Sequence, residues 1–124
     1  MDANDFDKLV EEALLSAVAP SFRRRLKNVV IVVEQEPSDP GLLGLYQGRP
    51  VTERSTAEFS AMPDRITIYQ GPHERMARNA AHLRRLVEET VWHEVAHYFG
   101  MSEAEVRRAE ARRARADFRR QGLK

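Results

Sequence analysis

Two histidines and a glutamate stand close together in a stretch whose other residues are mostly apolar. Residues 93–97 read His-Glu-x-x-His, within the longer stretch VWHEVAHYFG. On an α-helix four residues turn through about 400°, so His93 and His97 lie about 40° apart on one face and about 6 Å apart along the axis. Two imidazoles in this arrangement can bind one zinc ion, and Glu94 flanks that ion where it can hold a water molecule. The spacing therefore predicts a metal site at His93 and His97, with Glu94 beside the metal-bound water.

The residues around the motif support the prediction of a metal site. They predict a helix that is apolar nearly all round and passes through a core. Buried polar groups without partners are costly, and a metal ion would give all three side chains a partner. The alternative is that His93 and His97 are ordinary core residues hydrogen-bonded to backbone carbonyl groups, since His-Glu-x-x-His is a short pattern. The chain has no cysteine, so any further ligand must be a histidine or a carboxylate.

A third ligand is expected shortly after the helix. Gly100 follows His97 by three residues and is suited to end the helix as its C′ residue, because glycine tolerates the left-handed conformation. The reversed chain then reaches Glu103, which we expect to be the third ligand. Glu105, Glu110 or a water molecule are the alternatives, and Glu105 is also expected to form a capping box with Ser102.

Several stretches resemble a known family. The pattern H-E-x-x-H-x-x-G-x-x-E over residues 93–103 is similar to the metzincin type of zinc peptidase motif, with Glu103 where those enzymes carry a third His or Asp. More closely, LLGLYQG (42–48), RITIYQGP (65–72) and VWHEVAHYFGMSEAEV (91–106) resemble the minimal zincins, small bacterial predicted zinc metallopeptidases. The resemblance covers most of residues 26–106. Unlike in full metzincins, we expect no long C-terminal subdomain here, and residues 1–124 contain no recognisable Met-turn.

The resemblance implies a compact zincin core with zinc at His93 and His97, and peptide-bond hydrolysis in which Glu94 assists the attack of a metal-bound water. In zincins the strand before the active-site helix binds substrate as an added strand. Here that strand is expected at Arg65–Gln70, with an accessible edge. Tyr69 and Gln70 are therefore weak candidates for substrate contact, Tyr69 as an oxyanion donor, although packing on the face of the strand is the favoured role for Tyr69.

The remaining pattern predicts an α/β (α+β) fold, with one domain over residues 1–124 and about three strands in a mixed sheet packed on the active-site helix. The expected helices cover about 5–19, 74–99 with a break near 79–81, and an Arg/Ala-rich C-terminal helix at about 102–118; the expected strands cover 28–34, 43–47 and 65–71. Pro72 is expected to end the last strand. The polar, irregular segment 48–64 is expected at the surface, where it would line a site.

The composition of the chain bears on its location and on the rival hypotheses for its function. The net charge is +1, and no apolar run approaches the length of a membrane span, so we expect a cytoplasmic protein with no membrane contact. Seventeen of the twenty basic residues are arginine, and many of them fall in the last predicted helix. Nucleic-acid binding is therefore a rival but weaker hypothesis, because no reading motif accompanies these arginines. A third hypothesis is a catalytically weak or inactive metal-binding domain that acts through a protein partner. His73 and His82 are not expected to bind the metal.

Overall fold

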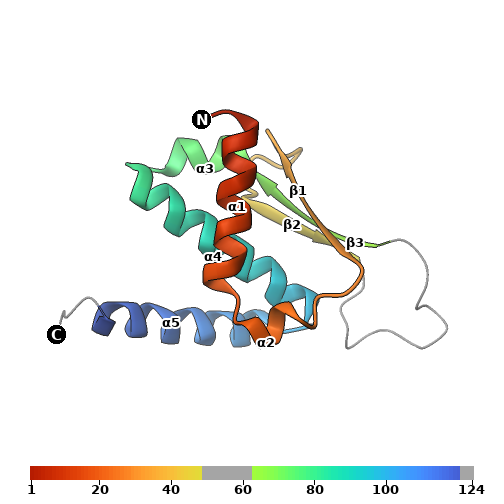
Figure 1. Cartoon of the computed structure of the whole chain (residues 1–124), viewed down its shortest axis with the longest axis vertical. Coiled ribbons are helices and arrows are strands. Elements are labelled where there is room, and N and C mark those ends of the chain that lie inside the picture. Colours follow the sequence, from red (N-terminus) through yellow and green to blue (C-terminus); the bar gives the residue numbers. More distant parts are fainter. Residues whose placement is uncertain (49–62, 121–124) are drawn as a thin grey trace.

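The computed structural model describes residues 1–48 and 63–120, apart from some side chains of the last helix. The fold is α+β, with helices surrounding a three-stranded mixed sheet, as the sequence predicted (Figure 1). In chain order the elements are α1 (Ala3–Ala17), α2 (Pro20–Arg23), β1 (Val29–Glu34), β2 (Gly44–Gln47), β3 (Asp64–Tyr69), α3 (Gln70–Met76), α4 (Ala80–Tyr98) and α5 (Glu103–Arg120).

The sheet has the strand order β1-β3-β2, so β3 is the central strand. β1 runs parallel to β3, with Val29 opposite Asp64 and Glu34 opposite Tyr69. β2 runs antiparallel to β3 on its other side, from Gly44 opposite Ile68 onward. The expectation that the strand before the active-site helix offers a free edge is therefore wrong, because β1 and β2 occupy both edges of β3. Strand order depends on contacts between distant segments, which the local alternation in 65–71 does not encode.

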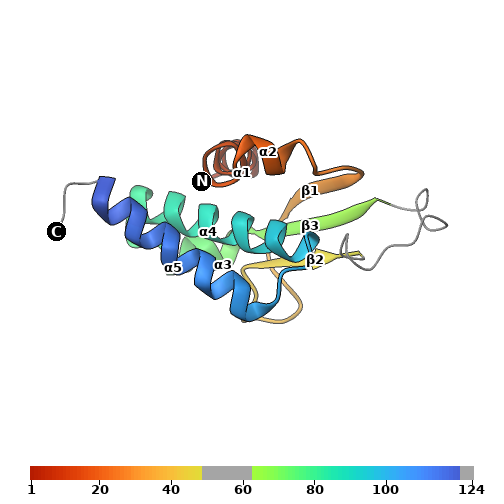
Figure 2. The same ribbon diagram turned by 90° about the horizontal axis from the view of Figure 1, so that it is seen from below.

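The hydrophobic core lies between the sheet and the helix pair α1 and α4. These two helices lie side by side on one side of the sheet (Figures 1 and 2). Phe6 of α1, Val87 and Val91 of α4, and Ile66 and Ile68 of β3 are all completely buried in this core. A run of β-branched residues makes β1, and partly buried side chains from that strand complete the packing. The core therefore holds α4 rigidly along the sheet.

Both ends of α4 are capped by nearby residues. The side chain of Asn79 accepts a hydrogen bond of 2.8 Å from the backbone N–H of His82, which starts the helix at the break expected near 79–81. At the other end Gly100 has φ 77°, and its N–H donates to the carbonyl of His97. The N–H of Met101 donates to the carbonyl of Ala96, which completes a Schellman motif. Gly100 thus ends α4 immediately after the histidine motif.

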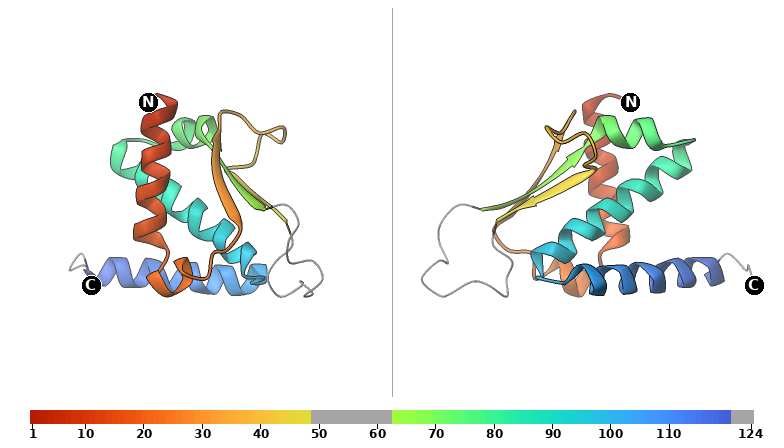
Figure 3. Two further views of the ribbon diagram at one scale, coloured as in Figure 1. Left: turned by 45° about the vertical axis from the view of Figure 1, so that its right-hand side comes forward. Right: turned by 180° about the vertical axis from the view of Figure 1, so that it is seen from behind.

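The chain then turns into α5, which starts at the C-terminal end of α4 and runs back at an angle to that helix (Figure 3). The predicted capping box is present: Ser102 N–H donates to Oε1 of Glu105 at 3.0 Å, and Glu105 N–H donates to Oγ of Ser102 at 3.1 Å. Val106 and Ala109 are buried, so α5 is packed against the rest of the protein near its start.

Three local details differ from the sequence expectations. The four-residue helix α2 was not predicted, and it begins at Pro20, a residue that suits the first turn. Pro72 does not end the strand but lies in the first turn of α3, where its missing N–H is tolerated. Residues 66–69 are all buried rather than alternating, because β3 is central. Most of the polar segment at 48–64 lies outside the described residues. Within the described residues no helix is long and apolar enough to cross a membrane.

Candidate metal centre

The two histidines of the motif lie on consecutive turns of α4 with their rings close together. The ring centres of His93 and His97 are 4.7 Å apart, and the ring planes are inclined by 66°. Zinc binds a histidine nitrogen at about 2.0–2.1 Å with tetrahedral angles, so two ligating rings have centres about 5 Å apart. The observed spacing fits a shared metal ion. Both side chains are partly exposed, so an ion can reach them.

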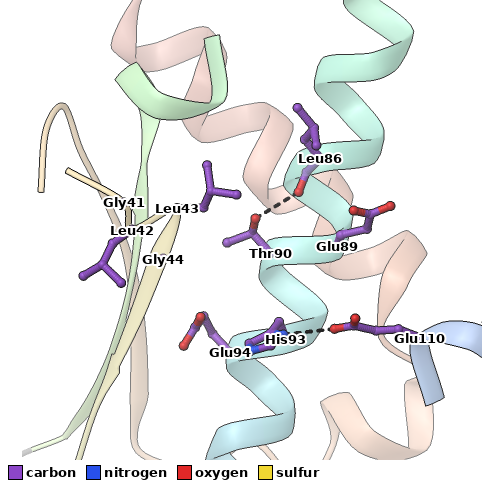
Figure 4. A pocket seen from close by; sticks show the side chains of 10 residues that line it. All are labelled: Gly41, Leu42, Leu43, Gly44, Leu86, Glu89, Thr90, His93, Glu94 and Glu110. Carbon is purple, nitrogen blue, oxygen red and sulfur yellow. Dashed lines mark hydrogen bonds and ion pairs between the residues drawn. The ribbon is translucent and has the colours of Figure 1, made fainter. Parts of the chain in front are cut away.

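Glu94 lies between this pair and the sheet. Its side chain is buried, with 8% of the residue exposed, and it points from α4 toward β2 (Figure 4). The residue is next to His93 in the chain but faces a different side of the helix, as the angle of about 100° per residue requires. Glu94 is therefore placed beside the face of α4 that carries His93 and His97, where it can exchange protons with a group held between α4 and β2.

Two adjoining cavities meet at these side chains. The first has a volume of about 310 Å³ and extends toward the start of α4, with Leu42, Leu43, Leu86 and Thr90 in its lining. The second, of about 530 Å³, extends toward the end of α4 and is lined by Leu45, Tyr46, His97 and Gly100 among others. His93, Glu94, Leu42 and Gly44 line both cavities. The motif therefore sits where an extended molecule lying along β2 would pass from one cavity into the other.

Gly44 allows β2 to approach α4 this closely. A Cβ atom on Gly44 would lie 2.7 Å from Cγ2 of Thr90, 3.1 Å from Cγ of Glu94 and 3.2 Å from the carbonyl oxygen of Thr67. Any larger side chain would push the strand away from Glu94. No local pattern predicts this contact between Gly44 and α4, because it joins residues that are about fifty positions apart.

The last helix also contributes to the site. Nδ1 of His93 lies 2.9 Å from Oε1 of Glu110, which reaches the histidine from α5 (Figure 4). Glu110 lines the first cavity together with His93 and Glu94. From the sequence, Glu110 is expected only as an alternative third ligand, and no sequence pattern indicates a contact between Glu110 and His93.

The identity of the third ligand stays a prediction. Glu103 begins α5, three residues after Gly100, but its side chain lies outside the described residues. Glu105 is occupied in the capping box, where hydrogen bonds from Ser102 lower its pKa, and it lines neither cavity. Among the side chains that the structure describes, no group of three or more His, Asp or Glu is arranged to hold a metal ion.

The other two described histidines lie away from the motif. His73 is completely buried, with Nδ1 2.6 Å from the carbonyl oxygen of Tyr69 and Nε2 2.8 Å from Oγ1 of Thr90. Burial lowers the pKa of His73, because desolvation penalises the charged imidazolium. His82 accepts a hydrogen bond on Nδ1 from the backbone N–H of Arg78, near the start of α4. Neither histidine lines the two cavities.

The structure does not place the weak substrate-binding candidates Tyr69 and Gln70 at the cavities. Tyr69 is 6% exposed and ends the central strand. Gln70 is 1% exposed; its amide N–H donates to the carbonyl of Met1, and its Oε1 accepts from Gln35. These contacts hold the start of α3 in place. Nothing in this arrangement supports a contact with substrate.

The comparison with protein families agrees with the geometry. Residues 26–113 match the model of a family described as zincin-like metallopeptidases. The match covers most of the chain, including β1, β2, β3, α4 and the start of α5, so the chain belongs to the zincin-like metallopeptidase family. Membership of this family implies zinc binding. The search of curated proteins gave no match.

Proposed function

We propose that this protein is a zinc-dependent peptidase in which His93 and His97 hold the metal and Glu94 is the general base. The observation that carries the proposal is the pairing of the two rings, 4.7 Å apart, with a buried carboxylate facing the adjacent strand. Glu103 is the proposed third protein ligand. It has support only from its position after Gly100 and from the resemblance of the motif to metzincins.

When bound, a zinc ion supplies Lewis-acid chemistry, since it acidifies a water molecule and stabilises negative charge on a carbonyl oxygen. Glu94 then acts through its own carboxylate. It takes a proton from the attacking water and returns that proton to the leaving amine. Its buried position between α4 and β2 limits its contact with bulk water. The chain's own contribution is thus to hold one base beside two fixed imidazoles.

We propose that the substrate is a peptide or protein segment in extended conformation, lying along β2. β2 pairs with β3 on one side, and within the described residues no strand pairs with its other side. It also contributes Gly44, Leu45 and Tyr46 to the second cavity. Backbone N–H and C=O groups at such an edge can bind an added strand. This location replaces Arg65–Gln70, because β3 is the central strand of the sheet and Gln70 already begins α3. A cytoplasmic location is also a proposal, resting on the sequence alone.

Glu94→Gln tests the proposal. The amide keeps the size of the side chain but cannot accept a proton, so zinc affinity should remain and hydrolysis of an unstructured peptide library should fall by about 10²–10⁴-fold. His93→Ala should lose both zinc binding and hydrolysis. Glu89→Gln removes one carboxylate from the lining of the first cavity and serves as the control for charge. Undiminished hydrolysis by purified Glu94→Gln protein would exclude Glu94 as the base.

A further inference from the structure

The contact between Glu110 and His93 joins the last helix to the metal-binding face. Oε1 of Glu110 lies 2.9 Å from Nδ1 of His93, and both side chains are about one third exposed. Glu110 comes from α5, which is fixed near its start by the buried residues Val106 and Ala109. The carboxylate is therefore presented to the imidazole by a packed helix.

We propose that Glu110 is a positioning residue that sets the tautomer and orientation of His93. A carboxylate is an acceptor, so the hydrogen bond requires a proton on Nδ1. A neutral imidazole carries only one proton, and Nε2 is then left with its lone pair. In histidines that bind metals, the N–H of the second ring nitrogen commonly donates a hydrogen bond to a carboxylate in this way. This bond fixes the ring orientation and makes the imidazole a stronger ligand. Glu110 thereby prepares Nε2 of His93 for the metal.

The same geometry separates this role from direct ligation. The two nitrogens of an imidazole point about 140° apart, so a group bonded to Nδ1 lies on the opposite side of the ring from an ion on Nε2. Glu110 in its observed position therefore acts on the metal only through His93. The inference rests on the proposed function, because it assumes that His93 is a metal ligand.

The experiment measures the zinc dissociation constant of the full chain by competition with a chromogenic chelator. Glu110→Ala should weaken zinc binding by about 10–100-fold, the usual loss when such a partner is removed. Glu110→Gln should recover much of the affinity, since the amide oxygen can still accept the Nδ1–H. Glu89→Gln, which loses a carboxylate from the same cavity, should bind zinc like wild type. In the metal-free protein, long-range ¹H–¹⁵N spectra should show His93 protonated on Nδ1, and Glu110→Ala should shift the balance toward Nε2–H.

Each alternative result has a distinct meaning. Equal zinc affinity for wild type and both Glu110 variants, with affinity lost in His93→Ala, would overturn the positioning role and leave the proposed function intact. A Glu110→Gln variant as weak as Glu110→Ala, with a changed visible spectrum of the cobalt-substituted protein, would make Glu110 a ligand and also overturn it. Wild-type protein that binds no zinc, or binds it equally well without His93, would refute both proposals.

Discussion

The close approach of β2 to α4 at Gly44 makes a quantitative prediction for Gly44→Ala. The added Cβ would lie 2.7 Å from Cγ2 of Thr90, whereas carbon atoms in good contact are about 3.5–4.0 Å apart. To remove this close contact, β2 and α4 must move apart by about 1 Å, and overpacking of this kind costs about 1–3 kcal/mol. Part of this cost is offset by about 0.4–1 kcal/mol, because alanine restricts the unfolded chain. We expect a net loss of about 1–2 kcal/mol in the free energy of unfolding.

Thermal and urea unfolding of purified variants measure this loss. In a domain of this size the expected change lowers Tm by roughly 4–8 °C. Gly41→Ala, three residues before Gly44 in the turn that leads into β2, is the matched control, because its Cβ would meet only Oδ1 of Asp39, at an ordinary 3.7 Å. Hydrolysis should also fall in Gly44→Ala, since the strand moves away from Glu94.

A double-mutant cycle identifies the responsible contact. Thr90→Ser removes Cγ2 but keeps Oγ1, which donates to the carbonyl of Leu86 and lies 2.8 Å from Nε2 of His73. The double variant Gly44→Ala/Thr90→Ser should be more stable than the sum of the single changes predicts, by about 0.5 kcal/mol or more. Strict additivity, or a Gly44→Ala protein as stable as Gly41→Ala, would refute the claim that this glycine sets the spacing between β2 and α4.

Two further predictions concern residues around α4. Gly100→Ala places a Cβ on a residue with φ 77°, a conformation that costs non-glycine residues about 1–2 kcal/mol, so its Tm should fall; an unchanged Tm would contradict the Schellman ending of α4. His73 has a lowered pKa in the folded state because it is buried, so the unfolded chain takes up a proton first as the pH falls below the ordinary value of about 6.5. The free energy of unfolding of the metal-free wild type should therefore decrease as the pH falls below about 6.5, and that of His73→Gln should decrease less. Equal pH dependence of urea unfolding in the two proteins would contradict this role of His73.

The features that the sequence predicted well depend on neighbouring residues. The β-branched run that forms Val29–Glu34 and the capping box at Ser102 and Glu105 were both found in place, because strand propensity and capping act within a few residues. The pairing of His93 with His97 likewise follows from helical geometry alone. These parts of the fold and site could be read from short stretches.

The features that were missed depend on tertiary structure. The central position of β3, the approach of Gly44 to Glu94 and the contact of Glu110 with His93 each join segments that are separated in the chain. No periodicity or motif in one segment specifies which distant segment will pack against it. The local pattern consequently points to 65–70 as the substrate strand, although the strand that lines the cavities is β2.

Anomalous diffraction at the zinc edge, from crystals of the full chain grown with zinc, shows directly whether His93 and His97 share one metal ion. One strong anomalous peak is expected between His93 and His97, at about 2.0–2.1 Å from Nε2 of His93 and from one nitrogen of His97. The peak should disappear in crystals of His97→Ala. Two imidazole rings that share no peak, while zinc binds elsewhere or not at all, would contradict the metal centre on which the proposed peptidase activity depends.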